Sequence, residues 1–154
     1  ARVLRRFDVN MTGLQRTQRG GRDRDTGVAY ITTEGLHEAL AEADHVVLVL
    51  PGDRSTDGFF TRRCFESMKS TAFLYNFGRG NCYDEADLVW ALGNERIAGA
   101  GLDVFAQEPL PPTSRLWTME NVLISPHSSC IYVDYMYLYY RELKQVVKSS
   151  GLHG

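Results

Sequence analysis

Three residues of the 154-residue chain have the chemistry to hold a carboxylate and to move a proton: Arg79, Glu108 and His127. Arg79 lies between Gly78 and Gly80, and its guanidinium group can grip a carboxylate through two parallel hydrogen bonds. Glu108 and His127 can form an acid–histidine pair, in which the carboxylate fixes the imidazole tautomer and favours its charged form. Taken singly, the arginine also fits a surface salt bridge and the histidine an ordinary loop position. The elements that position these residues decide between the two interpretations.

Apolar and amphipathic segments alternate along the chain, which is typical of α/β proteins. Strands are predicted at residues 9–12, 27–31, 45–51, 71–77, 97–105 and 121–125. Helices are predicted at residues 1–6, 32–44, 61–69, 84–96 and 131–149, with Thr33 and Thr61 as N-caps. The runs 45–51 and 97–105 show no polar alternation, as expected for strands buried on both faces of a parallel sheet. The predicted fold class is therefore α/β, with a doubly wound parallel sheet.

The three chemical residues all follow the ends of predicted strands. Arg79 comes after the strand at 71–77, and His127 comes after the strand at 121–125. Glu108 comes after the strand at 97–105. Ligands of a doubly wound sheet bind at the carboxyl ends of its strands, close to the point where the strand order reverses. Several strands that end in polar or glycine-bearing loops therefore predict a shared cleft, and this favours the functional interpretation.

Composition sets the outer limits of the class of protein. A chain with 44% hydrophobic and 23% charged residues is an ordinary soluble domain, and its net charge of -2 offers no basic surface to nucleic acid. The longest apolar run, HVVLVLP, is too short to cross a membrane. Cys64, Cys82 and Cys130 form no CxxC pair and no even disulfide set, so a cytoplasmic location is predicted, with thiols that are not nucleophiles. We assign no metal site and give His37, His45 and His153 no role.

Four longer segments together carry a family resemblance: LVLPGDRSTDGFF, MKSTAFLYNFGRGNCYDEADLVWAL, IAGAGLDVFAQEPLPPTSRLW and NVLISPH. They resemble successive signatures of the D-isomer-specific 2-hydroxyacid dehydrogenases, a family that includes phosphoglycerate dehydrogenase and the glyoxylate/hydroxypyruvate reductases. The resemblance extends from Ala1 to about Lys148 and includes the spacing of the segments. It implies a Rossmann-type sheet and transfer of a hydride between NAD(P)H and a small 2-ketoacid or 2-hydroxyacid. It also implies a homodimer.

The resemblance assigns a role to each candidate residue. Arg79 would bind the substrate carboxylate and the keto oxygen, His127 would be the acid/base, and Glu108 would be its carboxylate partner. Asp103 matches the position that holds the nicotinamide carboxamide. Further cofactor-lining positions are matched by Leu50, Pro51, Phe77 and Gly78.

The chain departs from the family pattern at its beginning. The glycine-rich phosphate loop, GxGxxG, is absent, and the opening residues ARVLRRFD resemble the end of the helix that follows this loop. We therefore predict that the sheet lacks its first strand and this loop. Residues 1–148 are predicted to be part of an NAD(P)-binding domain and residues 149–154 a polar tail, with the substrate domain absent from this chain.

The choice between NAD and NADP depends on the residue after the first predicted strand. NAD-binding members generally place an acid there, which bonds the ribose 2′-hydroxyl. This chain has Gln15 at that place, followed by Arg16 and Arg19, and a cationic site without an acid tolerates a 2′-phosphate. NADP is therefore favoured over NAD. The alternative is that these arginines are solvated loop charges.

Two function classes remain open at this stage. The first is a 2-hydroxyacid dehydrogenase or 2-ketoacid reductase, which the intact set of Arg79, Glu108 and His127 favours. The second is a non-catalytic relative, either a dinucleotide-binding module like the C-terminal-binding corepressors or an inactive truncated fragment. The absent phosphate loop favours the inactive fragment.

Overall fold

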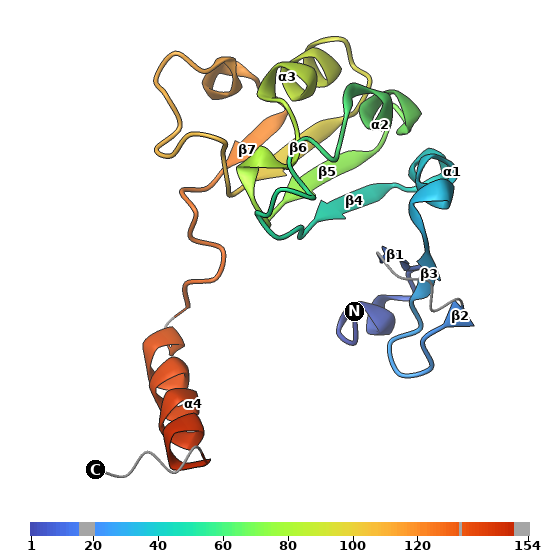
Figure 1. Cartoon of the computed structure of the whole chain (residues 1–154). Coiled ribbons are helices and arrows are strands. Elements are labelled where there is room, and N and C mark those ends of the chain that lie inside the picture. Colours follow the sequence, from blue (N-terminus) through green and yellow to red (C-terminus); the bar gives the residue numbers. More distant parts are fainter. Residues whose placement is uncertain (16–20, 133, 150–154) are drawn as a thin grey trace.

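The strands form two sheets in the computed structural model, which describes residues 1–15, 21–132 and 134–149 (Figure 1). The larger sheet is parallel throughout, in the order β4-β5-β6-β7, with β4 His45–Leu48, β5 Phe73–Asn76, β6 Gly99–Leu102 and β7 Val122–Ile124. The smaller sheet has the order β1-β3-β2, with β1 Thr12–Leu14, β2 Gly21–Arg22 and β3 Ala29–Ile31. Strand β3 pairs in parallel with β1 and in antiparallel with β2.

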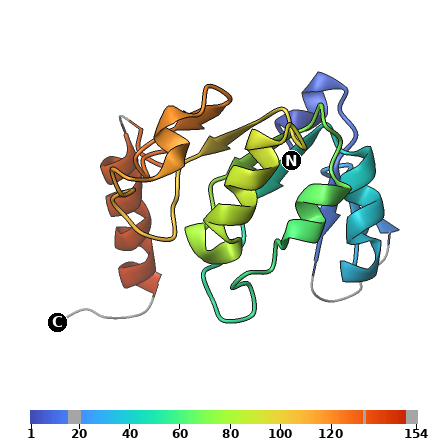
Figure 2. The same cartoon turned by 90° about the horizontal axis from the view of Figure 1, so that it is seen from above.

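Helices make the crossover connections between the parallel strands, as the predicted fold class requires. Helix α2 Arg62–Ser67 connects β4 to β5, and α3 Glu85–Gly93 connects β5 to β6. Helix α1 Leu36–Glu42 leads from β3 of the smaller sheet to β4 of the larger one. Figures 1 and 2 show α2 and α3 next to each other over one face of the larger sheet, with α1 beside α2. The other helical elements are the 3-10 helices η1 Leu4–Phe7, η2 Thr33–Gly35, η3 Gly80–Cys82 and η4 Arg115–Thr118, and the helix α4 Tyr135–Ser149. The α/β class and the alternation of elements are thus confirmed.

The hydrophobic core lies between the larger sheet and the helices α2 and α3. Its fully buried side chains include Phe65, Leu74, Leu88, Ile97 and Leu102. Side chains that point to the other face of the sheet are exposed, for example Val47 at 53%, Phe73 at 41% and Leu123 at 75%. The prediction that the strand at 45–51 is buried on both faces is therefore wrong for the described chain. Alternate residues of β4 point to a face that no described helix covers.

Strand β6 is buried along its whole length, as predicted. Its glycines explain this, because the aromatic rings of the neighbouring strand lie over them. A Cβ atom at Gly99 would be 3.1 Å from Cε1 of Phe73, and one at Gly101 would be 3.1 Å from Cδ1 of Tyr75. Gly99 and Gly101 therefore let β5 cover β6 and leave no room for a larger side chain there.

Several predicted boundaries near the N-terminus are wrong. The helix predicted at residues 1–6 is the 3-10 helix η1 at Leu4–Phe7, and the strand predicted at 9–12 is β1 at Thr12–Leu14. Thr33 lies inside η2 and is not an N-cap. Strand β2 was not predicted, because its two residues belong to a polar run with no apolar periodicity. Thr61 does occupy the N-cap position of α2, although its side chain makes no cap hydrogen bond.

The two sheets are not joined by strand pairing within the described ranges. A cavity of about 330 Å³ separates them and is lined by β1, α1 and β4. The predicted fold places one more strand between β1 and β4, and this stays a prediction. Helix α4 stands apart from the larger sheet in Figure 1, and its aromatic side chains, such as Tyr139, are exposed. Across the described residues, no helix is long and apolar enough to span a membrane.

Candidate active site

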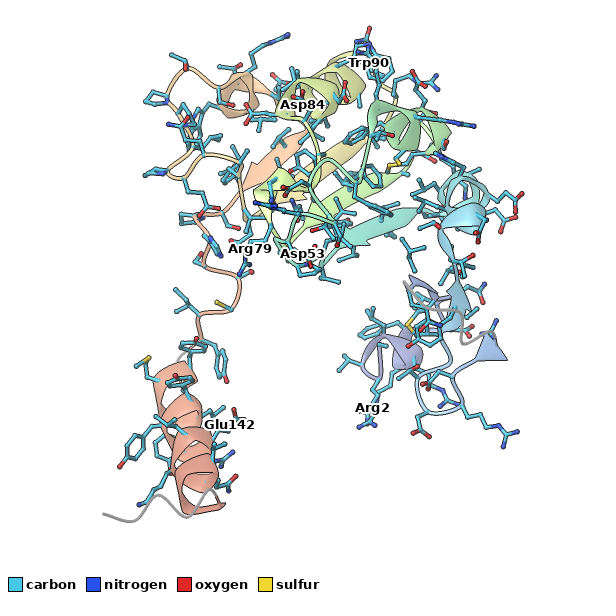
Figure 3. The ribbon with its side chains drawn as sticks, in the orientation of Figure 1. Arg2, Asp53, Arg79, Asp84, Trp90 and Glu142 are labelled. Carbon is cyan, nitrogen blue, oxygen red and sulfur yellow. The ribbon has the colours of Figure 1, made fainter. Side chains whose placement is uncertain are left out.

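The ends of β5, β6 and β7 bring the three chemical residues around one cavity. Its volume is about 410 Å³, and Arg79, Glu108 and His127 all line it, together with Gly52, Gly80, Asn81, Phe105 and Ala106. Figure 3 shows Arg79 at the edge of the sheet where its strands end. The parallel register carries each polar loop to this same edge, so the shared cleft that the sequence predicts is present.

Arg79 is held in an extended backbone conformation directly after β5, with φ −142° and ψ 145°. Its side chain lies across Gly52, where a Cβ atom would be only 2.8 Å from Cγ of the arginine. The Nη1 group donates a hydrogen bond to the carbonyl oxygen of Gly78, 2.8 Å away. The guanidinium group has five N–H donors, so this single bond leaves donors for a carboxylate.

The loop that carries Arg79 is shaped by Asn76, whose side chain is fully buried at the end of β5. Its Oδ1 atom accepts a hydrogen bond from the Gly78 N–H at 3.0 Å, and its Nδ2 group donates to the carbonyl oxygen of Arg79 at 3.1 Å. The next residue, Gly80, packs against backbone, because a Cβ atom there would be 1.9 Å from the carbonyl carbon of Phe105. The arginine loop is thus fitted against the segment that leads to the acid.

Glu108 and His127 form the predicted pair. Oε2 of Glu108 is 2.7 Å from Nδ1 of His127, and Oε1 of Glu108 accepts from the backbone N–H of Phe105 at 3.0 Å. The bond with His127 and then the bond from Phe105 hold the pKa of Glu108 below its usual range. The acid is therefore ionised at neutral pH and holds the imidazole through Nδ1. Because Nδ1 is engaged, Nε2 is the ring nitrogen that remains for a substrate.

Asp103, at the end of β6, is 1% exposed and accepts hydrogen bonds from the loop that carries the histidine. Its Oδ1 atom accepts from the Ser125 hydroxyl at 2.6 Å and from the Ser128 N–H at 2.9 Å. The Ser129 N–H lies 3.2 Å from Oδ1 and 3.1 Å from Oδ2. Burial opposes the charged form, but these bonds outweigh it and lower the pKa of Asp103 to about 2.

The residues predicted to line a cofactor fall into two groups. Leu50, Pro51, Phe77 and Gly78 lie after β4 and β5, and their loops are in contact, since a Cβ atom at Gly78 would be 2.7 Å from the Leu50 nitrogen. Gln15 follows β1 in the other sheet, where its N–H donates to the carbonyl oxygen of Ile31 at 3.1 Å. Arg16 lies outside the described residues.

Sequence reasoning gave no role to Asn76 or to the serines around His127. A polar residue that ends an apolar run is the available signal, because a side chain so close to the core must find its partners within the protein. For two of the three cysteines the structure fits the prediction that they are not nucleophiles: Cys64 and Cys82 are buried, and burial raises the pKa of Cys82 to about 11. Cys130 is exposed, and for it this stays a prediction.

Comparisons with known proteins agree with this geometry. The sequence profile described as D-isomer specific 2-hydroxyacid dehydrogenase, NAD binding domain, matches residues 1–129. The chain belongs to this family. As a 2-hydroxyacid dehydrogenase domain it is 37% identical over 129 residues to a glyoxylate reductase of Korarchaeum cryptofilum, covering 84% of this chain and 38% of that protein. It is 48% identical over 92 residues to glyoxylate/hydroxypyruvate reductase B of an Enterobacter species, covering 60% of this chain and 28% of that one.

A solved structure of the family shows the same arrangement of elements. It is an NADPH-dependent glyoxylate/hydroxypyruvate reductase of Sinorhizobium meliloti in complex with NADP and sulfate, with a TM-score of 0.82 and 31% identity. The match covers 99% of this chain and 49% of the solved one. The chain therefore spans half the length of these relatives or less.

Proposed function

We propose that the protein is an oxidoreductase that transfers a hydride between NAD(P)H and a small 2-ketoacid or 2-hydroxyacid. The observation that carries the proposal is the single cavity lined by Arg79 and by the bonded pair of Glu108 and His127. A cation for a carboxylate and a paired imidazole for a proton are the two groups that reduction of a 2-ketoacid needs. Residues 1–148 would act as part of the NAD(P)-binding domain, with residues 149–154 as a polar tail.

Each residue has a defined task in this reaction. Arg79 binds the substrate carboxylate, and its fixed charge stabilises the negative charge that develops on the carbonyl oxygen. His127, held through Nδ1, donates the Nε2 proton to that oxygen. Glu108 keeps the imidazole in the required orientation. Bound NAD(P)H supplies the hydride.

The cofactor would be held by the two groups of residues at the strand ends. Leu50, Pro51, Phe77 and Gly78 would line its nicotinamide half, and Asp103 would contact the carboxamide. Phe77 follows β5, stacks on Tyr75 with ring centroids 6.5 Å apart, and is 46% exposed, so part of its ring surface is open for this purpose. Gln15 and Arg16 would face the ribose 2′ position and favour NADP over NAD. The Sinorhizobium meliloti relative, solved with NADP, supports this choice.

The wider setting of the protein follows from the same observations. We infer a cytoplasmic protein, because Cys64, Cys82 and Cys130 are all free thiols. The family resemblance supports a homodimer. The net charge of -2 gives the chain no excess of basic residues, which argues against a nucleic-acid partner.

The test uses the full-length protein with NADPH and glyoxylate, hydroxypyruvate or larger 2-ketoacids. His127→Ala should lower kcat by roughly 10²- to 10⁴-fold while NADPH still binds, because general acid/base catalysis contributes about that much. Arg79→Lys should lose almost as much activity as Arg79→Ala, since a point charge cannot replace the planar fork. His37→Ala, which changes a histidine on α1 that bonds Ser67, is the matched control and should keep wild-type rates.

Near-normal turnover in His127→Ala or Arg79→Lys would overturn these roles. A wild-type protein that binds NADPH tightly and reduces no 2-ketoacid would instead support the non-catalytic dinucleotide-binding alternative.

A further inference from the structure

Asp103 is a buried carboxylate that accepts hydrogen bonds from one loop, at residues 125–129. Within the described part of the chain only Thr56, Asn76 and Asp103 are buried polar or charged side chains, and the last two lie at the ends of β5 and β6. Of these, Asp103 alone carries a charge. Its two oxygens accept from one hydroxyl and two backbone N–H groups, all in residues 125–129. An ionised carboxylate fits such a set of donors, because it is an acceptor only.

The loop that these bonds hold has an unusual backbone at its centre. His127 has φ 52°, in the left-handed region that residues with a side chain seldom adopt. The bonds to Asp103 come from both sides of it, from Ser125 before it and from Ser128 and Ser129 after it. A conformation of this kind persists only when its surroundings fix it. Within the described structure, Asp103 is the side chain that fixes both ends of this turn.

The acid thus connects two adjacent strand ends. Asp103 N–H donates to the Asn76 carbonyl oxygen at 3.1 Å, and Ser125 N–H donates to the Leu102 carbonyl oxygen at 2.9 Å. The backbone at the end of β6 is therefore hydrogen-bonded to the ends of both neighbouring strands. The Asp103 side chain adds a further connection, to the loop that carries the histidine. Asn76 does the corresponding task for the Arg79 loop with a neutral amide, which can both donate and accept.

We propose that Asp103 is a positioning residue that holds His127 in its left-handed turn, so that Nδ1 meets Glu108 and Nε2 is presented to the substrate. This role rests on the proposed ketoacid reduction and adds to the cofactor contact that the resemblance implies for Asp103. A residue that only contacts the cofactor would have no need of bonds to three serines of the catalytic loop.

The decisive variant is Asp103→Asn in the full-length protein, since the amide keeps the shape of the acid but directs an N–H group toward the donors. We expect the exchange of the Ser128 and Ser129 amide hydrogens to accelerate by at least about tenfold, because loop opening then costs less. We expect kcat to fall by about tenfold or more as the acid/base loses its orientation, with a smaller change in the KM for the ketoacid. The ¹⁵N resonances of the His127 ring should lose the pattern of an Nδ1 atom bonded to a carboxylate.

Ser125→Ala tests the same idea through a milder change that removes one hydroxyl and no charge. It should shift amide exchange and kcat in the same direction by a smaller factor, which keeps the proposal testable if Asp103→Asn does not fold. Ser114→Ala is the matched control, because that hydroxyl bonds Glu85 on α3, away from the cavity that holds His127. Asn76→Asp should act on the Arg79 loop and raise KM more than it lowers kcat.

The outcomes separate this proposal from the proposed function. Wild-type protein without turnover would contradict the function, while the amide exchange and the His127 resonances would still report on the loop. If Asp103→Asn weakened NADPH binding and left loop exchange, the His127 resonances and kcat at saturating cofactor unchanged, Asp103 would be a cofactor ligand only. Unchanged loop exchange and kcat in both variants would likewise overturn the positioning role.

Discussion

The two sheets differ in how much hydrophobic core supports them. The larger sheet, with the loops at its strand ends up to Ser129, rests on a continuous core of aliphatic and aromatic side chains under α2 and α3. The smaller sheet has Val28 as its one buried hydrophobic residue among the described residues of Thr12 to Ile31. The groups assigned to proton transfer are therefore mounted on packed strands, and the group assigned to cofactor choice on a thin sheet near the surface. Chemistry that depends on orientation lies where the backbone is most constrained.

Polar contacts differ between the two regions in the same way. The larger sheet ends in buried anchors, such as Asn76 and Asp103, that tie loops to strands. In the smaller sheet the corresponding bonds are exposed: Arg5 donates to the carbonyl oxygens of Arg24 and Asp25, and Asp23 accepts from the Asp25 N–H. Water competes for exposed bonds, so they hold a loop less firmly than buried ones. We expect the region near Gln15 to adapt to a ligand and the region near His127 to be preorganised.

Substitutions at two glycines should show the largest contrast between the regions. Gly80→Ala would place Cβ 1.9 Å from the carbonyl carbon of Phe105, and backbone on both sides cannot move aside without shifting the Glu108 segment. We expect a loss of about 3 kcal/mol or more in the free energy of unfolding, at the upper end for overpacking. Gly13→Ala in β1 would meet Val28 Cγ1 at 2.9 Å and Tyr30 Cε1 at 3.0 Å, which are side-chain atoms and not backbone.

Urea unfolding of the two variants measures this contrast directly. We expect Gly13→Ala to cost less, about 1 to 2 kcal/mol, because the overlap is with side chains of a lightly packed sheet and not with backbone. Equal losses in the two variants would show that the smaller sheet is as tightly constrained as the larger one. A Gly80→Ala variant with wild-type stability would mean that the contact between the Arg79 loop and the Glu108 segment is not a fixed one.

The difference in burial between the two sheets also explains which elements could be predicted from the sequence. The strands of the larger sheet were predictable because their apolar runs are continuous, and the chemical residues were found because each follows such a run. The N-terminal boundaries were wrong because the described residues up to Ile31 bury little, so that no periodicity marks their elements. One-sided burial of β4 could not be seen, since Val47 is equally apolar whether or not a partner covers it. The hydrogen bonds of Asp103 join it to Ser125 and Ser128, at least 22 positions later in the chain, so they depend on tertiary contacts alone.

Low pH should destabilise the larger sheet through protonation of its buried carboxylate, Asp103. The pKa of Asp103 falls from its usual 3.8 to about 2 in the folded protein. A lowered pKa stabilises the fold above the unfolded value, and this contribution is lost as the pH falls from about 4 to about 2. We expect the loss to be about 2 kcal/mol in the wild type, which corresponds to a shift of this size.

Unfolding curves recorded between pH 5 and pH 2, in the wild type and in Asp103→Asn, isolate this effect. Other acids with lowered pKa values, such as Glu108 and Asp44, titrate in both proteins, so only the difference between the two curves belongs to Asp103. The difference should shrink as the pH falls toward 2, because the protonated acid and the amide are both neutral. A difference that stays constant over this range would mean that the charge of Asp103 contributes nothing to stability.

The smallest effect is expected in the thin sheet, where a single charge should tune the cofactor without disturbing the fold. Gln15 follows β1, and its backbone N–H bond to Ile31 does not depend on its side chain. Gln15→Asp should move the ratio of kcat/KM for NADPH and NADH toward NADH by about tenfold, because a carboxylate accepts from the 2′-hydroxyl and repels a 2′-phosphate. Asn10→Asp, which adds the same charge at an exposed position before β1, is the control for long-range charge effects. If both variants change the ratio equally, the net charge of the surface determines the preference and Gln15 has no specific role. If Gln15→Asp leaves the ratio of kcat/KM unchanged, the ribose 2′ position is recognised by other residues.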